Sequence, residues 1–196
     1  ALTVVGSEQP LRSFTISFVA PVAIGEVSLQ TTVLRRGKSV IQVETKMLQN
    51  SAVVAMALQS FGLSRESNII IAPEIAPCFK APADCLTLPY VPQVTPDFTR
   101  HFDLCWAVGT LPFTASTSGT MGGWMRFSNE ASDCQVGHLL ALADAWPPSV
   151  LPMFKTVAPI STLTWTVEFL SNHFQVLGSD WWQYLADADA SANGYA

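Results

Sequence analysis

The sequence predicts an α+β fold in which antiparallel sheet wraps a long buried helix, and this arrangement occurs twice in tandem. Three observations predict it. Residues 11–61 hold four strand-like segments joined by short turns, and residues 134–146 form one strongly apolar helix-like segment. The third is a five-residue segment near the N-terminus that recurs 151 residues later (14 + 151 = 165).

The four N-terminal segments predict a meander of long antiparallel strands. The first is rich in β-branched and aromatic residues, and Pro21 blocks its continuation. The next two alternate between apolar and polar residues, which is the period of a strand with one buried face. The predicted strands are Leu11–Ala20, Gly25–Arg35, Ser39–Leu48 and Ala52–Phe61.

Proline interrupts the regular pattern in the middle of the chain. Six of the thirteen prolines fall between residues 73 and 96, where they should prevent helix formation and ladder pairing. The segment is too apolar for a free flexible linker, so we expect it to lie over the surface. We therefore divide the chain into a first repeat (1–63), a Pro-rich connection (64–100) and a second repeat (101–196).

The second repeat holds the one convincing helix, predicted over Cys134–Trp146 and ended by two prolines. Ser132 or Asp133 could cap its start. The helix is apolar nearly all round, which is typical of a helix buried inside a fold. Strands are predicted at Phe102–Leu111, Gly122–Ser128, Thr162–Leu170 and Trp181–Asp189.

The internal repeat aligns Phe14–Phe18 with Trp165–Phe169. Each copy is followed by a bend, a glycine and another strand. When the alignment is extended, the first repeat's buried helix maps before Ala1, and the last two strands of the second repeat map after Ala196. We therefore expect the chain to be cut at both ends relative to a complete two-repeat fold.

Charge and composition exclude several classes of partner. Ten Lys and Arg against fifteen Asp and Glu give a net charge of −5, which argues against nucleic acid and against an anionic membrane surface. No apolar run approaches the roughly 20 residues of a spanning helix, so we expect no membrane insertion. Residues 1–10 lack a secretory signal pattern, and we expect a cytoplasmic protein.

The motifs of cofactor and metal binding are also missing. The sequence has no P-loop, no dinucleotide-binding glycine motif and no nucleophile elbow. The cysteines lack zinc-ligand spacing, and we expect free and mostly buried thiols. They are Cys78, Cys85, Cys105 and Cys134. We therefore expect neither a metal nor an organic cofactor.

Asp144 is the first candidate for a functional residue. It is the only charged residue between Asp133 and Lys155, and it lies on the most apolar helix of the chain. Burying a carboxylate costs several kcal/mol unless donors or water meet it. A desolvated carboxyl group should have a raised pKa, which suits a general base. The alternative is a helix-end carboxylate that bonds a backbone amide in the turn that follows.

Thr162 and the histidines carry less information by themselves. A threonine at the start of a strand is ordinarily a sheet residue. Its interest lies in a pairing with Asp144, because a hydroxyl group could help to fix an attacking water. The histidines are scattered at His101, His138 and His173, and we expect His138 to be a satisfied core histidine.

Five segments together resemble the double-hotdog acyl-CoA thioesterases of the thioesterase II type. They are Phe14–Phe18, Leu34–Ser39 (LRRGKS), Ala57–Phe61 (ALQSF), Leu142–Pro148 (LADAWPP) and Ser161–Phe169. The resemblance covers residues 11–61 and 119–196 well and the Pro-rich connection poorly. It implies a tandem hotdog fold and hydrolysis of an acyl-CoA substrate. It also implies a homodimer at least, because hotdog sheets often continue across subunits.

The resemblance also implies a catalytic set. In that family an Asp on the buried helix acts with a Thr or Ser about eighteen residues later and a Gln on the last strand. Asp144 and Thr162 match the first two, and the Gln is expected after Ala196. Gln59 holds the corresponding place in the first repeat, where the family does not generally use it. The implied mechanism is direct attack of a water that these side chains orient, without a cofactor.

Two other functions stay open at the level of the sequence. One is a non-catalytic hotdog that binds acyl groups or serves as a scaffold. The other is a hotdog enoyl-CoA hydratase, which would use an Asp/His pair. His138 precedes Asp144 by six residues, a poor spacing for one helical face. We therefore expect the thioesterase reaction.

Overall fold

The computed structural model describes residues 1–6, 9–129, 132–171 and 176–196. The chain forms two compact units, and each is described by itself. The first unit comprises Ala1–Ala72 and Ile160–His173, and the second comprises Pro73–Pro159 and Phe174–Ala196.

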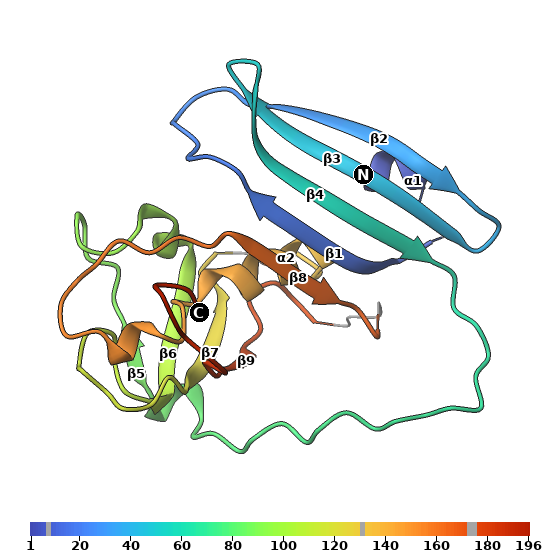
Figure 1. The fold of residues 1–196 in the computed structure, drawn as a ribbon. Helices are drawn as coiled ribbons and strands as arrows, with labels where there is room; N and C mark the ends of the chain where they lie inside the picture. The colour runs from blue at the N-terminus through green and yellow to red at the C-terminus, as the bar shows by residue number, and fades with distance from the viewer. Residues whose placement is uncertain (7–8, 130–131, 172–175) are drawn as a thin grey trace. The chain divides into compact units, whose positions relative to one another are not determined.

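A five-stranded antiparallel sheet forms the first unit, with the strand order β2-β3-β4-β1-β8 (Figure 1). Its strands are β1 (Leu11–Phe18), β2 (Ser28–Arg36), β3 (Val40–Gln49), β4 (Ala52–Gly62) and β8 (Thr164–Glu168). The predicted meander is confirmed, with strand ends that differ by a few residues. Asn50 and Ser51 join β3 to β4 with φ angles of 51° and 66°, the left-handed pair of a two-residue hairpin turn.

The pairing of β1 with β8 joins the two copies of the repeated sequence. Thr15 lies directly opposite Thr166, its equivalent 151 residues later, and their hydroxyl oxygens are 3.1 Å apart. The ring of Phe14 meets the ring of its equivalent Trp165 edge to face, at 5.8 Å between centroids. Equivalent residues that face each other across an antiparallel pair are the signature of a local two-fold axis.

One face of this sheet combines buried apolar residues with a short polar line. Ile41, Val43 and Phe61 are almost fully buried. Across the strands, the Thr45 hydroxyl group donates to Gln59 Oε1 at 3.2 Å and lies 3.2 Å from the hydroxyl oxygen of Thr31. The polar side chains of this face therefore hydrogen-bond to one another across three neighbouring strands.

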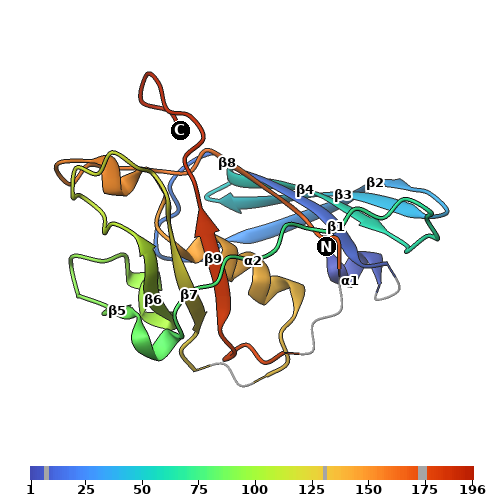
Figure 2. The same ribbon diagram turned by 90° about the horizontal axis from the view of Figure 1, so that it is seen from below.

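The second unit contains a four-stranded antiparallel sheet of order β5-β6-β7-β9 (Figures 1 and 2). Its strands are β5 (Leu86–Leu88), β6 (Phe102–Gly109), β7 (Met121–Phe127) and β9 (Trp182–Ala186). The expectation that the Pro-rich connection forms no ladder is wrong for β5. This strand fits between Pro82 and Pro89, so all of its three residues can pair with β6.

Two glycines let β7 approach both of its neighbours closely. A Cβ atom at Gly123 would overlap the backbone carbonyl of Cys105, where β6 carries an irregularity in its register. A Cβ atom at Gly122 would overlap the carbonyl of Tyr184 on β9. The sheet geometry therefore requires glycine at both positions.

The helix α2 (Val136–Ala145) confirms the predicted helix within two residues at its start and one at its end. Among the described residues it is the only helix longer than seven residues, since α1 (Leu2–Val5) has four. A buried helix in each repeat is thus not observed. The expectation that α2 is buried all round is also wrong: Leu142 and Ala145 are buried, whereas Ala141 and Asp144 are exposed. Apolar composition predicts burial, but the sheet covers only one side of the helix.

Three short 3₁₀ helices complete the described structure: η1 (Pro82–Asp84), η2 (Asp97–His101) and η3 (Leu151–Met153). The Pro-rich connection packs against the sheet of its own unit. Trp124 on β7 donates its indole N–H to the carbonyl of Lys80 at 2.8 Å, and Phe79 meets the Trp124 ring edge to face. Part of the connection thus lies over the outer face of β7.

Candidate functional site on the α2 helix

A side chain of α2 itself caps the start of the helix. The N-cap is Gln135, so the predicted caps Ser132 and Asp133 lie outside the helix. The backbone N–H of Gln135 donates to His138 Nδ1 at 2.9 Å, which satisfies a group that the helix leaves free. His138 is half-buried, and its ring meets Phe127 edge to face. This histidine therefore supports the helix, as expected of a satisfied side chain.

Asp144 lies at the opposite end of α2, one residue before the helix ends. The residue is exposed, although the sequence predicts a carboxylate on a buried helix. Nevertheless, the protein around the carboxyl group partly desolvates it and raises its pKa above the ordinary value. Its carboxylate has no hydrogen-bond or ion-pair partner among the described residues, and the alternative of a bond to the following turn is not observed there.

Three aromatic rings form a stack immediately beyond Asp144. Trp106 on β6 and Tyr184 on β9 lie in register on either side of Gly123, which has no side chain. The indole ring of Trp146 lies between them, stacked at 5.3 Å on Trp106 and at 5.4 Å on Tyr184. Leu142, on the preceding turn of α2, packs into the same core. The sheet thus fixes the C-terminal end of α2 through the ring of Trp146.

Tyr184 responds to the charge of Asp144. Burial of the Tyr184 hydroxyl group raises its pKa, and the negative charge of Asp144 raises it further. The carboxylate is therefore close enough to the aromatic stack to act on it electrostatically. The sequence does not single out Tyr184, because its place in the stack depends on strand register.

Thr162 lies just before β8, which begins two residues later than predicted. It is exposed, and its hydroxyl group makes no hydrogen bond to a described residue. Thr162 belongs to the first unit, whereas Asp144 belongs to the second, so each is described within its own unit. Gln59, on β4, accepts the hydrogen bond from Thr45.

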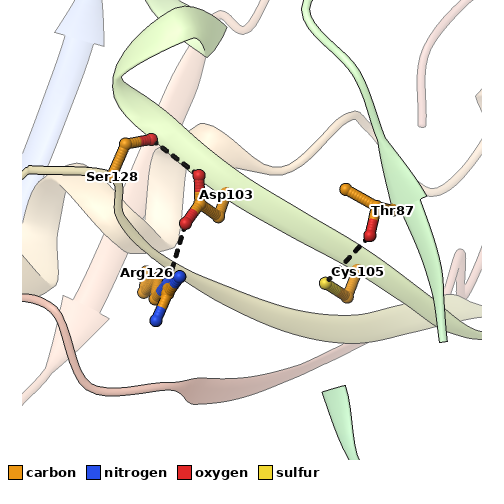
Figure 3. Close-up of polar contacts among 5 residues, drawn as sticks. All are labelled: Thr87, Asp103, Cys105, Arg126 and Ser128. Carbon is orange, nitrogen blue, oxygen red and sulfur yellow. Dashed lines mark hydrogen bonds and ion pairs between the residues drawn. The ribbon is translucent and has the colours of Figure 1, made fainter. Parts of the chain in front are cut away.

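A second polar cluster lies on the other face of the β5-β6-β7-β9 sheet (Figure 3). Asp103 accepts hydrogen bonds from Arg126 Nε and the Ser128 hydroxyl group, both at 2.8 Å. The guanidinium group of Arg126 also lies over the ring of Trp181, 4.4 Å from its centroid. The charges of this cluster pair with each other, so its geometry indicates a structural role across the strands.

The cysteines are free, as predicted, and two of them are buried. Burial raises the pKa of the Cys105 and Cys134 thiols, which keeps them protonated and unreactive. Cys78 is exposed and Cys85 is half-buried, so the expectation of mostly buried thiols holds for only two of the four.

The described part of the chain offers no group of three His, Cys, Asp or Glu side chains that could hold a metal ion. His101 is exposed on η2, and His173 lies outside the described residues. Within the same described residues, no helix has both the length and the apolar character needed to cross a membrane.

Comparison with known proteins gives two matching family models. That of the acyl-CoA thioesterase C-terminal domain matches residues 82–196, and that of the acyl-CoA thioesterase N-terminal domain matches residues 1–62. A search of curated proteins finds no match. The two family models together cover both predicted repeats.

Solved structures with the same fold extend over nearly the whole chain. A conserved hotdog-fold protein of unknown function from Alicyclobacillus acidocaldarius has a TM-score of 0.81 at 24% identity, covering 94% of this chain and 69% of that one. A putative thioesterase II from Thermobifida fusca has a TM-score of 0.72 at 19% identity, covering 94% and 68%. An acyl-CoA thioesterase II from Mycobacterium marinum has a TM-score of 0.75 at 15% identity, covering 98% and 73%. The hotdog fold with two antiparallel sheets is thereby confirmed.

Proposed function

Because the chain belongs to the acyl-CoA thioesterase family, we propose that it hydrolyses an acyl-CoA thioester to a free acid and CoA, with Asp144 as the general base. One observation above all supports this role. The Asp144 carboxylate has no partner among the described residues, and desolvation raises its pKa. A carboxyl group in that state is suited to take a proton from water near neutral pH.

The proposed reaction uses water as the nucleophile. As the water oxygen bonds to the thioester carbonyl carbon, one of its protons passes to the Asp144 carboxylate. The tetrahedral intermediate then reforms the carbonyl and releases the sulfur by breaking the C–S bond. The departing thiolate takes the proton from Asp144, so that the products are the acid and CoA with a free thiol.

Thr162 is the second member of the proposed set, with its hydroxyl group holding the water for Asp144. The glutamine that the family resemblance implies after Ala196 is the third. The set requires the Thr162 oxygen to lie within one water of the Asp144 carboxylate in the active protein. A homodimer and a cytoplasmic location remain predictions from the sequence.

Replacement of Asp144 by asparagine tests the general base. Asp144→Asn keeps the size of the side chain but cannot take the proton, so we expect acyl-CoA hydrolysis to fall by about 10²–10⁴. Asp84→Asn is the matched control, because Asp84 is an exposed carboxylate of the same unit without a hydrogen-bonded side-chain partner among the described residues. Hydrolysis by Asp144→Asn at the wild-type rate would remove the assignment.

Replacement of Thr162 tests the water-binding hydroxyl group. Thr162→Val keeps the shape and loses the hydroxyl group, whereas Thr162→Ser keeps it. We expect the valine variant to lose activity and the serine variant to keep most of it. Equal activity of the two variants would exclude a role for the hydroxyl group.

A panel of acyl-CoA substrates separates the proposed function from its alternatives. Release of free thiol from saturated acyl-CoAs of several chain lengths supports hydrolysis. Hydration of unsaturated acyl-CoAs without thiol release would indicate a hydratase, a reading weakened by the use of His138 in the helix cap. Binding without either reaction would indicate an acyl-binding protein.

A further inference from the structure

The indole N–H of Trp146 is a buried donor without an acceptor among the described residues. The residue is 5% exposed, so bulk water does not satisfy this group. A buried donor that lacks an acceptor costs free energy comparable with a lost hydrogen bond, and native folds keep few of them. The group therefore requires an explanation beyond packing.

Two other tryptophans of the same sheet use their indole N–H in a hydrogen bond. Trp106 donates its N–H to the carbonyl of Gly109 at 3.1 Å, and Trp124 donates to the carbonyl of Lys80 at 2.8 Å. Trp146 takes part in the same stack as Trp106, and a stack needs only the ring. The N–H of Trp146 is thus a group that the stack itself does not use.

Trp146 is linked to the proposed base through the chain and through Tyr184. It follows Asp144 by two residues, at the C-terminal end of α2. Its ring stacks on Tyr184, and the negative charge of Asp144 raises the pKa of the Tyr184 hydroxyl group. The ring is held between two strands, so the donor is fixed in place before any ligand arrives.

We propose that Trp146 Nε1–H donates to the carbonyl oxygen of the bound acyl thioester and to the oxyanion that forms from it. This inference rests on the proposed thioesterase function and names a binding group that it needs. An indole N–H donates but cannot accept, so it discriminates for an oxygen that gains negative charge. A preorganised donor at that oxygen stabilises the transition state without reorganisation.

The electron movements fit this role. When the water attacks the carbonyl carbon and Asp144 takes its proton, the carbonyl π electrons move onto the oxygen. That oxygen carries the negative charge that the Trp146 N–H stabilises. When the electrons return, the C–S bond breaks and the donor keeps its own proton throughout.

Replacement of Trp146 by phenylalanine removes the donor and keeps an aromatic ring in the stack. We expect kcat to fall by about 10²–10³, the usual effect of losing one oxyanion donor, with a smaller change in KM. Trp124→Phe is the matched control, because it removes an indole from the other face of β7 and should leave kcat within a few-fold. Wild-type kcat in folded Trp146→Phe would overturn the inference.

The indole resonances of the wild-type protein provide a readout that needs neither turnover nor a variant. Two unreactive acyl-CoA analogues serve as probes: a ketone in which methylene replaces the sulfur, and a thioether in which methylene replaces the carbonyl. We expect the assigned Trp146 N–H proton signal to move downfield with the ketone and much less with the thioether. Equal shifts, or no shift on saturation with the ketone, would overturn the inference even if Trp146→Phe fails to fold.

The two proposals fail in different ways. If the wild-type protein neither hydrolyses nor binds acyl-CoA, both are overturned. If the wild-type protein hydrolyses acyl-CoA and Asp144→Asn does not, but Trp146→Phe keeps its kcat, the thioesterase proposal stands and the oxyanion donor is overturned.

Discussion

The polar line of the first unit and the C-terminal end of α2 differ in how their polar groups are partnered. In the β2-β3-β4-β1-β8 sheet, Thr31, Thr45 and Gln59 are joined to one another by hydrogen bonds. In the unit of the β5-β6-β7-β9 sheet, the Asp144 carboxylate and the Trp146 N–H lie beside an aromatic stack without partners among the described residues. Buried polar groups of native folds are mostly paired, so a buried donor without an acceptor, such as the Trp146 N–H, requires an explanation. The comparison therefore favours a structural role for the polar line of the first unit, and it is consistent with the proposed roles of Asp144 and Trp146.

The largest expected effect concerns the glycine that separates Trp106 from Tyr184. Gly123→Ala would force a Cβ atom into the backbone of Cys105, so we expect the free energy of unfolding to fall by about 3 kcal/mol or more. Gly137→Ala is the control, because nothing lies within 4 Å of its added Cβ atom on α2. There we expect a gain of about 0.5–1 kcal/mol from helix propensity. Urea denaturation measures the stability of both variants, and equal stability would refute the close approach of β7 to the β6 backbone at Gly123.

A smaller effect is expected in the polar line of the first unit. Thr45→Val keeps the shape of the side chain and removes the hydroxyl group that bonds to Gln59. We expect a loss of about 1–2 kcal/mol in the free energy of unfolding, with acyl-CoA hydrolysis unchanged.

Thr32→Val is the matched control for this prediction, since Thr32 is the exposed neighbour of Thr31 on β2 and should cost little. A large loss of kcat in folded Thr45→Val would contradict a purely structural role for this polar line. It would also give Gln59 a function that the family resemblance does not imply.

Local sequence patterns were sufficient for most of the fold. The alternation in residues 28–61 predicts β2, β3 and β4, and the apolar run before Pro147 predicts α2. The strand β5 was missed because three residues between two prolines are too few to show a period. The helix cap was missed because Gln135 is not a preferred capping residue, and the His138 side chain completes the cap.

The candidate site also has features that the sequence predicts and features that it does not. A lone charge on an apolar helix is visible in the sequence, and it correctly marked Asp144 as a group with a raised pKa. The position of the Trp146 ring between Trp106 and Tyr184 cannot be predicted from the sequence. It depends on Trp106, Gly123 and Tyr184 coming into register on three strands. The exposure of Asp144 was also missed, since composition predicts how apolar a helix is but not which side the sheet covers.

The smallest expected effect is the pH dependence that Asp144 gives to stability. Because desolvation raises the pKa of folded Asp144 above 3.8, the folded state holds the proton more tightly than the unfolded chain does. This contribution favours folding at pH values below the pKa of Asp144 in the unfolded chain. It is lost as pH rises through the higher pKa of Asp144 in the folded protein. The asparagine side chain of Asp144→Asn does not titrate, so the variant has no such contribution to lose. The stability of Asp144→Asn relative to wild type should therefore increase with pH between the unfolded and the folded pKa of Asp144 and then stay constant.

Urea denaturation at a series of pH values measures this difference. The effect should be small, because Asp144 is exposed and water screens its charge. It should also persist at high salt, because its cause is desolvation and not attraction between charges. The rising limb of kcat/KM should report the same group, with a pKa above the ordinary value for aspartate. A stability difference that falls with pH would mean that a favourable partner holds the Asp144 carboxylate, and the contrast between Asp144 and the paired polar line would then disappear.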